Sequence, residues 1–333
     1  MRVLQLTNMY PTPTRPYYGV FVKRQVDAVR AGGIETDVFF TDASGGRRRY
    51  LNAIPSLRRA LREQPFDLVH AHHTYCALQA RVAGLGRQRI PLVLTLHEGE
   101  VYGGLRLAMR ERVHPLRLLT YTRGPKRLAL GLADRRVSVE VGLPREVGFE
   151  GPVEVIAPGT DLELFRPLDP ALCRRKLGLP EDRPIVFFPA DPENRNKGFD
   201  LVRQSLDRIA AEPLLLGGGQ IPPPEMPTHI NASDVVVQAS AYEAAPTVIR
   251  EAMACGVPVV STPTGDVEQL LDGTRAGFIA EREPADLGRC IEAALAAGRY
   301  PDAGRARLRE LGMTLEETTA RYLDLYRELA EAT

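Results

Sequence analysis

The sequence predicts an α/β protein with two domains, each built around a doubly wound parallel sheet. Short apolar segments recur along the chain and alternate with stretches of helical character, the pattern of parallel strands joined by crossover helices. A connector with prolines at both ends, 158–167, separates two such series. The length of 333 residues is sufficient for two domains with substantial cores.

The first series opens with a strand at 2–7 and a loop rich in proline and tyrosine. Gly19 then precedes an amphipathic helix, which a glycine pair at 32–33 ends. Further strands are expected at 36–40, 67–72, 91–96, 136–139 and 153–157. We assign 1–165 to the first domain.

The second series has strands at 184–188, 214–216, 234–238 and 257–261. We assign 166–312 to the second domain and 313–333 to a terminal helix.

Composition limits the class of protein. Hydrophobic residues make up 44% and charged residues 26%, which is ordinary for a globular protein, and a net charge of +1 gives no field that would attract nucleic acid. The four cysteines lack metal-ligand spacing, and no apolar run reaches the length of a membrane span. The chain opens directly on a strand without a signal peptide, so we expect a cytoplasmic, reducing location.

The most informative segment holds Glu243 and Glu251, eight positions apart. Strand 234–238 precedes it, Pro246 suits the first position of a helix, and Gly256 is placed to end that helix. Glu243 therefore falls in the strand-to-helix loop and Glu251 inside the helix. Two ordinary helix charges would give the same spacing, but the surrounding strand, loop and helix signals favour a binding site.

The start of this helix is suited to a diphosphate. Five residues of helix rise roughly 7.5 Å, about the length of a diphosphate, and a helix N-terminus attracts phosphate. Carboxylates can accept hydrogen bonds from sugar and ribose hydroxyls. The residues expected to contact such a donor are Glu243, Ala245, Pro246, Thr247, Val248 and Glu251.

This segment resembles the donor site of the retaining GT-B glycosyltransferases of family four (glycosyl transferases group 1). The resemblance implies two Rossmann-like domains that face a central cleft, with the C-terminal helix packed back on the first domain. It also implies a nucleotide diphosphate sugar as donor, with UDP favoured. In that family the position of Glu251 holds the ribose, and the position of Glu243 contacts the transferred sugar.

Two basic residues near the start of the second domain extend the resemblance. Lys197 corresponds to the lysine that neutralises the departing diphosphate, although a solvated lysine at a helix start would look the same. Family members carry an arginine just after the strand, where this chain reads Pro189-Ala190-Asp191. Arg195 could supply the missing charge from the loop.

In the first domain the resemblance extends to Gly19 and His97. Gly19 matches a glycine close to the diphosphate, although a turn glycine would look the same. His97 follows an apolar strand, as in relatives that place this histidine beside the reacting sugar; a hydrogen-bonded loop histidine is the alternative. We interpret His70 and His72 as satisfied strand histidines rather than metal ligands.

The resemblance thus implies a retaining hexosyltransferase with His97, Lys197 and Glu243 at its catalytic centre. No Asp-x-Asp occurs, so we expect no metal and no cofactor, and the absence of G-x-G-x-x-G argues against a nicotinamide dehydrogenase. The acceptor would be a hydroxyl of a glycan, lipid-linked or small-molecule substrate. A nucleotide-sugar epimerase or hydrolase of the same fold, or a non-catalytic sugar-nucleotide sensor, remains as an alternative.

Basic residues gather in the first domain, which receives the acceptor in this family. They could bind the inner face of a membrane or a lipid diphosphate, although solvated faces of an arginine-rich protein explain them as well. They are Arg47, Arg48, Arg49, Arg58, Arg59, Arg62, Arg106, Arg110, Arg112, Arg117, Arg123, Lys126, Arg127, Arg135 and Arg136.

Overall fold

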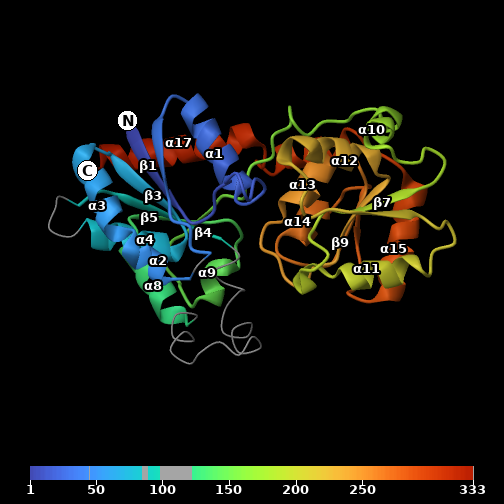
Figure 1. The fold of residues 1–333 in the computed structure, drawn as a ribbon, viewed down its shortest axis with the longest axis horizontal. Helices are drawn as coiled ribbons and strands as arrows, with labels where there is room; N and C mark the ends of the chain where they lie inside the picture. The colour runs from blue at the N-terminus through green and yellow to red at the C-terminus, as the bar shows by residue number, and fades with distance from the viewer. Residues whose placement is uncertain (45, 85–88, 98–121, 333) are drawn as a thin grey trace. The chain divides into compact units, whose positions relative to one another are not determined.

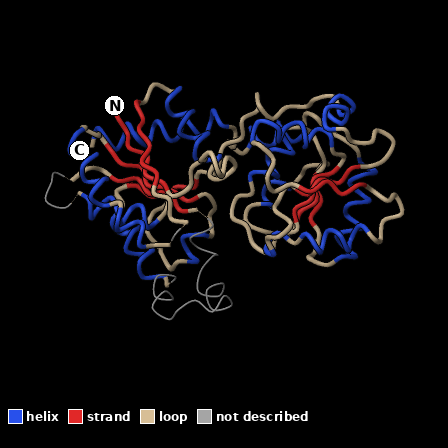
Figure 2. The backbone as a smooth tube through the Cα atoms, viewed as in Figure 1, coloured by secondary structure: helices blue, strands red, loops and turns tan. Residues whose placement is uncertain are grey.

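In the computed structural model, the chain forms two compact units, each built around one parallel sheet (Figures 1 and 2). The structure describes residues 1–333 except 45, 85–88, 98–121 and 333. Unit 1 consists of Met1–Pro158 and Glu316–Thr333, and unit 2 of Gly159–Leu315.

The sheet of unit 1 has six strands in the order β2-β1-β3-β4-β5-β6, and all neighbours run parallel. Since β2 and β3 lie on opposite sides of β1, the winding of the sheet reverses at β1. The strands are β1 (Arg2–Thr7), β2 (Glu35–Phe40), β3 (Leu68–His72), β4 (Leu92–Leu96), β5 (Arg135–Ser138) and β6 (Glu154–Val155). The described helices are α1 (Val20–Ala31), α2 (Arg48–Asn52), α3 (Ile54–Glu63), α4 (Thr74–Ala83), α8 (Arg123–Leu132), α9 (Leu143–Glu146) and α17 (Leu315–Glu331).

The C-terminal helix α17 completes the core of unit 1, which confirms its expected return to the first domain. Its buried face carries Tyr322, Leu325, Tyr326 and Leu329, at spacings of three and four residues. These side chains pack with apolar residues of the sheet strands, among them Val3, Leu68, Val93 and Val137.

The sheet of unit 2 has five parallel strands in the order β11-β10-β9-β7-β8. The strands are β7 (Ile185–Phe188), β8 (Leu214–Gly217), β9 (Val235–Gln238), β10 (Val259–Ser261) and β11 (Gly277–Ile279). The helices are α10 (Pro170–Leu177), η1 (Arg195–Lys197), α11 (Phe199–Leu206), η2 (Pro223–Glu225), α12 (Met226–Ala232), α13 (Thr247–Ala254), α14 (Val267–Leu271), α15 (Pro284–Ala297) and α16 (Ala303–Glu310). As predicted, this unit too is doubly wound.

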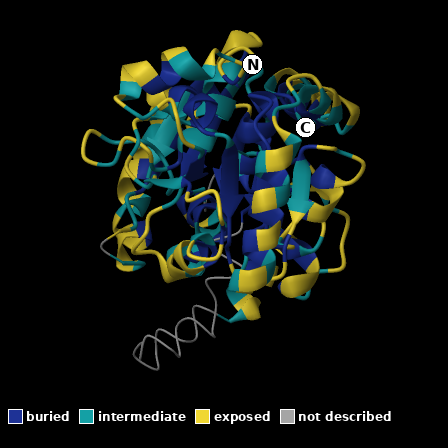
Figure 3. Ribbon diagram, turned by 90° about the vertical axis from the view of Figure 1, so that its right-hand side faces the viewer, coloured by how far each residue is buried: buried dark blue, intermediate teal, exposed yellow. Residues whose placement is uncertain are grey.

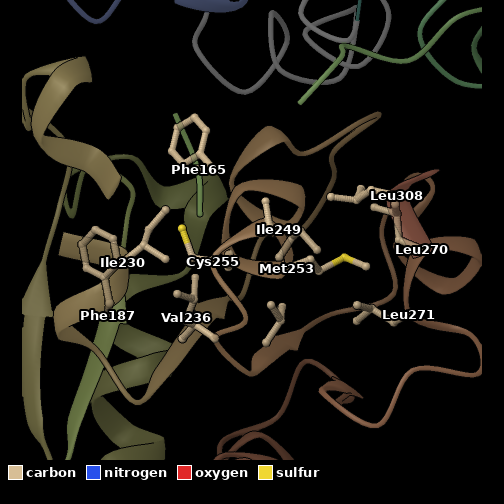
Figure 4. Packing of buried hydrophobic residues seen from close by; sticks show 14 of the residues in the cluster. Phe165, Phe187, Ile230, Val236, Ile249, Met253, Cys255, Leu270, Leu271 and Leu308 are labelled. Atoms are coloured by element: carbon tan, nitrogen blue, oxygen red, sulfur yellow. The ribbon is translucent and has the colours of Figure 1, made fainter. Parts of the chain in front are cut away.

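Buried side chains fix α13 against the sheet of unit 2. Ile249 and Met253 of this helix pack among Phe187 and Val236 of the strands and Phe165 of the connector (Figure 4). Figure 3 shows the burial of each residue: the strands are buried, and the outer faces of the helices are exposed.

The end of α13 confirms the stop expected at Gly256. This glycine has φ +69°, and its N–H and that of Val257 donate to the carbonyls of Met253 and Ala252 at 3.1 and 3.0 Å. This is the Schellman pattern, which a left-handed glycine after a helix permits.

The units divide at Pro158 and Leu315 rather than at the predicted 165 and 312. The difference arises because the connector packs on unit 2. The side chain of Phe165 is fully buried in that unit's core, and Arg305 donates to the carbonyl oxygens of Leu162 and Phe165. Backbone bonds between Thr160 and both Met313 and Leu315 fix the other crossing of the chain.

Along the described residues, no helix combines the length and apolar character needed to cross a bilayer. The four cysteines are buried and unpaired by disulfides.

Candidate functional site

The candidate site of unit 2 lies where the winding of its sheet reverses. Strands β7 and β9 are neighbours, with β8 on the far side of β7 and β10 on the far side of β9. Their carboxyl-terminal loops, 189–198 and 239–246, therefore flank the switch point, the place where open α/β sheets bind ligands. Lys197 and Glu243 lie in these two loops.

Asn196 joins the two loops. Its side-chain amide donates to the carbonyl of Tyr242 at 3.0 Å and accepts from the Tyr242 N–H at 3.3 Å. Its backbone carbonyl also accepts from the N–H of Ala241 at 2.9 Å. Three hydrogen bonds thus hold the turn before Lys197 against the segment that carries Glu243.

Within this junction, the ammonium group of Lys197 forms an ion pair with Oε1 of Glu243. The side chain of Glu243 is only 5% exposed, whereas that of Lys197 is 29% exposed. An ammonium beside a nearly buried carboxylate compensates much of the cost of burying that charge. The structure therefore brings together two residues that the sequence assigned to the site from separate motifs.

The position of Lys197 depends on Gly198. Lys197 ends the 3-10 turn η1 instead of opening α11 as expected, and Gly198 is the N-cap of α11 with φ +75°. A Cβ at Gly198 would lie 2.4 Å from the carbonyl oxygen of Ala239. Close approach of the two loops therefore requires glycine here.

Helix α13 begins at Thr247, with Pro246 as its N-cap rather than its first residue. The first N–H groups of a helix have no partner within it, so those of Thr247 and Val248 are donors at this turn. Ala245, Thr247 and Val248 are half-buried. Glu251 lies about one turn into α13 and is 7% exposed.

A buried ion pair that the sequence did not predict supports the turn that leads into α13. Arg250 is fully buried; its guanidinium donates to the carbonyl of Pro246 at 3.1 Å and pairs with Asp266, which is 8% exposed. Burial lowers the pKa of Arg250, and the Asp266 carboxylate opposes that shift. A second link is the N–H of Asp266, which donates to the carbonyl of Ala244 at 3.1 Å.

Gly265 allows this second contact. It has φ +57°, and a Cβ there would lie 2.0 Å from the carbonyl oxygen of Ala244. The loop after β10 thus lies directly against the segment that carries Glu243.

Arg195, by contrast, is exposed in η1. Its expected role in replacing the family's arginine stays a prediction.

In unit 1, Gly19 has a structural reason of its own. It is the N-cap of α1 with φ +70°, and a Cβ would lie 2.3 Å from the carbonyl carbon of Met9. Conformation and packing therefore both require glycine at the start of α1. Because these two constraints alone account for Gly19, its proximity to a diphosphate stays a prediction.

His97 follows β4 and is 6% exposed, with its ring 5.3 Å from that of Phe21. Its Nε2 lies 3.4 Å from Nδ1 of His72. His70 and His72 are fully buried in β3 and hydrogen-bonded, as their interpretation as satisfied strand histidines required. Among the described residues, no group of three or more His, Cys, Asp or Glu side chains is arranged to hold a metal ion.

Several of the basic residues anchor the fold of unit 1. Arg58 donates to the carbonyls of Ala83 and Val82 at the end of α4, and the Arg47 guanidinium lies 5.0 Å from the centre of the Tyr75 ring. Lys126 is buried, and Arg136 donates to the Leu130 carbonyl. The exposed members are Arg48, Arg49, Arg59, Arg62, Arg123, Arg127 and Arg135. Arg106, Arg110, Arg112 and Arg117 lie outside the described residues.

Comparisons with known proteins agree with this architecture. The model of Glycosyltransferase Family 4 matches residues 12–164, and that of Glycosyl transferases group 1 matches residues 203–297. A D-inositol 3-phosphate glycosyltransferase of Geodermatophilus obscurus is 28% identical, over 75% of this chain and 64% of the relative. One of Thermobispora bispora with the same name is 27% identical, over 96% and 83%. The chain thus spans less than two thirds of the length of the first relative and more than two thirds of the length of the second.

Solved structures show the same fold over the whole chain. Sucrose-phosphate synthase from Thermosynechococcus elongatus has a TM-score of 0.80 at 19% identity, with 100% of both chains covered. Anabaena HepE, solved in complex with UDP, has a TM-score of 0.69 at 17% identity, over 98% of this chain and 100% of that one. From the matched families, the relatives and the two parallel sheets, we conclude that the chain belongs to glycosyltransferase family 4 and has the GT-B fold.

Proposed function

We propose that this protein transfers a hexose-type sugar from a nucleotide diphosphate sugar, UDP-linked by preference, to an acceptor hydroxyl with retention of configuration. The observation that carries the proposal is the ion pair of Lys197 and Glu243 at the switch point of unit 2. The loop that carries Glu243 leads directly into α13. The positive charge of Lys197, the acceptor oxygens of Glu243 and the N–H groups at the start of α13 therefore belong to adjoining segments. HepE binding UDP supports the choice of base.

Each part of the site has a distinct task in this proposal. The N–H groups of Thr247 and Val248, with Ala245 and Pro246 shaping the turn, receive the diphosphate. Glu251 accepts hydrogen bonds from the ribose hydroxyls. Since an ionised carboxylate offers about four acceptor sites, Glu243 can hold Lys197 and still accept from hydroxyls of the sugar.

The bond to the sugar breaks as negative charge gathers on the departing diphosphate. Lys197 is a mobile point charge, and charge stabilisation that grows in the transition state accelerates the reaction. We propose front-face departure, in which the leaving group itself helps to take the acceptor proton. This route needs no protein nucleophile and, with Lys197 supplying the positive charge, no metal ion. In unit 1, we assign His97 to the reacting sugar and Gly19 to the diphosphate.

The acceptor side of the proposal rests on unit 1. The exposed arginines of α2 and α3 are Arg48, Arg49, Arg59 and Arg62, and α2 also carries the exposed Leu51. Basic residues next to an exposed apolar side chain suit peripheral contact with an anionic membrane or a lipid-linked acceptor. Cytoplasmic location on the inner face of the membrane is part of this proposal.

Product analysis tests the function. Thermal shifts with UDP, GDP and ADP identify the base, because a ligand that binds only the native state raises its stability. UDP-glucose is then incubated with glycan, lipid-diphosphate and inositol-phosphate acceptors, including D-inositol 3-phosphate, with and without EDTA. We expect an α-glycoside in the proton NMR spectrum and no effect of EDTA. Free glucose alone would indicate a hydrolase, and UDP binding without turnover would indicate a sensor.

A further inference from the structure

A chain of buried polar side chains crosses unit 1 from α17 to His97. It consists of Tyr326, His70, Thr95, Gln5, His72 and His97, of which all but His97 are fully buried. These residues come from α17, β1, β3, β4 and the end of β4. Buried polar groups are stable only when their hydrogen bonds are made, so the direction of each bond in such a chain constrains the next.

The hydrogen bonds begin at Tyr326. Its hydroxyl accepts from Nε2 of Gln5 at 3.1 Å and lies 2.5 Å from Nδ1 of His70. The hydroxyl has one proton and two lone pairs, so it can donate to His70 Nδ1 or accept from it. On the other side of the ring, Nε2 of His70 lies 2.7 Å from Thr95 Oγ1.

The hydrogen bonds that lead to His97 run through Gln5. The amide nitrogen of Gln5 serves Tyr326, so its Oε1 faces His72 and accepts from Nε2 of that ring at 2.8 Å. His72 then has its proton on Nε2, which makes its Nδ1 an acceptor. Nδ1 lies 3.4 Å from Nε2 of His97, with the two rings stacked at 5.7 Å.

This direction requires that His70 and His72 are neutral. Burial lowers the pKa of His70 to about 3 and that of His72 well below its usual range. A neutral imidazole has one donor and one acceptor, so each ring passes on a fixed polarity.

We propose that His72 is a positioning residue that orients the His97 ring and fixes its proton on Nε2. Nδ1 of His97 is then the acceptor nitrogen of the ring. The catalytic part of the inference rests on the proposed function, in which His97 contacts the reacting sugar. The tautomer itself does not depend on that function.

Two matched variants separate positioning from packing. In His72→Asn the amide oxygen replaces Nδ1 and can still accept from His97, whereas in His72→Gln the amide replaces Nε2 and keeps the contact with Gln5. We expect His72→Gln to lower kcat about tenfold or more, the effect of one lost hydrogen bond, and His72→Asn to stay within about threefold. KM and the UDP dissociation constant are expected to stay close to the parent values, since most of the residues assigned to the donor lie in unit 2. Equal kcat losses in the two variants would show a purely structural role.

The tautomer is measured directly by 15N NMR of the full-length protein labelled at its six histidines. The spectrum of His97→Asn identifies the signals of His97. We expect a protonated Nε2 and an unprotonated Nδ1 in the parent and in His72→Asn, and a mixture of tautomers in His72→Gln. A parent protein with the proton on Nδ1 overturns the inference. If the parent transfers no sugar, the proposed function fails, and the tautomer measurement alone decides the role of His72.

Discussion

The ammonium of Lys197 forms an ion pair with the carboxylate of Glu243, 46 positions further along the chain. The loops after β7 and β9 carry the two residues, and Asn196 holds these loops together through Tyr242. In the proposed function, a donor that enters this place meets an already assembled pair of charges. Such preorganisation lowers the cost of stabilising charge that develops during the reaction.

Lys197→Met is expected to lower kcat by about 10²–10³-fold, the loss typical of one preorganised group at a developing charge. The UDP dissociation constant should change much less, because the charge of Lys197 matters most as the diphosphate departs. Steady-state kinetics and calorimetry measure the two effects. Lys176→Met, at an exposed lysine of the same unit, is the matched control. If Lys197→Met stays within a few-fold of the parent, the leaving-group role belongs to another residue, with Arg195→Met the next variant to test.

Glu251→Ala is expected to weaken UDP binding by about 1.5–3 kcal/mol, since the ribose hydroxyls lose a charged acceptor. Calorimetry of the folded variant measures this loss. Glu243→Ala serves as the comparison: it should impair turnover of the intact UDP-sugar more than binding of UDP. Unchanged UDP affinity in Glu251→Ala would remove this residue from the ribose site.

Breaking the Arg250–Asp266 pair from one side is expected to destabilise unit 2. Arg250→Met leaves the Asp266 carboxylate buried without its partner, a change that costs about 3–5 kcal/mol. The double variant Arg250→Met/Asp266→Asn removes both charges and should recover part of this loss. Urea unfolding gives the free energies, and equal losses in the single and double variants would show that the charge pair is not the cause.

Signals in the sequence act on neighbouring residues, which limits the prediction of contacts between distant parts of the chain. Pro246 and Gly256 act on their own neighbours, so the position of α13 was predictable to within one residue. The pairing of Lys197 with Glu243 and of Arg250 with Asp266 joins loops after different strands, and nothing local marks which carboxylate an arginine will meet. An arginine between Ile249 and Glu251 looks like a surface residue until the packing of α13 is known. The connector 159–165 was misplaced because burial of Phe165 depends on unit 2, not on the composition of the linker.

Stability is expected to fall on acidification because His70 and His72 are buried as neutral rings. The folded pKa is about 3 for His70 and well below the usual 6.5 for His72, so below pH 6.5 the unfolded state binds more protons. The stabilisation is complete above pH 6.5 and is lost as pH falls through this window, by up to about 1.36 kcal/mol per pH unit for each histidine. Urea unfolding between pH 7 and pH 5 gives the slope. His70→Gln should reduce the slope by the share of one histidine, and an unchanged slope would assign the effect to other groups.

Membrane contact through α2 and α3 is expected to be electrostatic and therefore salt-sensitive. Exposed charges are screened over about 10 Å at about 0.1 M salt, so cosedimentation with phosphatidylglycerol vesicles should decrease as salt is raised. Replacing Arg48, Arg59 and Arg62 by Glu should abolish binding without changing UDP affinity.

The matched control for this surface is a triple arginine-to-glutamate variant of unit 2, at the exposed Arg208, Arg275 and Arg309. Both triple variants change the net charge equally, so a nonspecific effect of total charge would reduce vesicle binding in both. Loss confined to the Arg48, Arg59 and Arg62 variant identifies α2 and α3 as the docking face, because only the location of the charges differs. If the parent protein stays in the supernatant even at low salt, the acceptor is to be sought among soluble molecules. Arg58 and Arg136 then keep only the structural role that their bonds to backbone carbonyls give them.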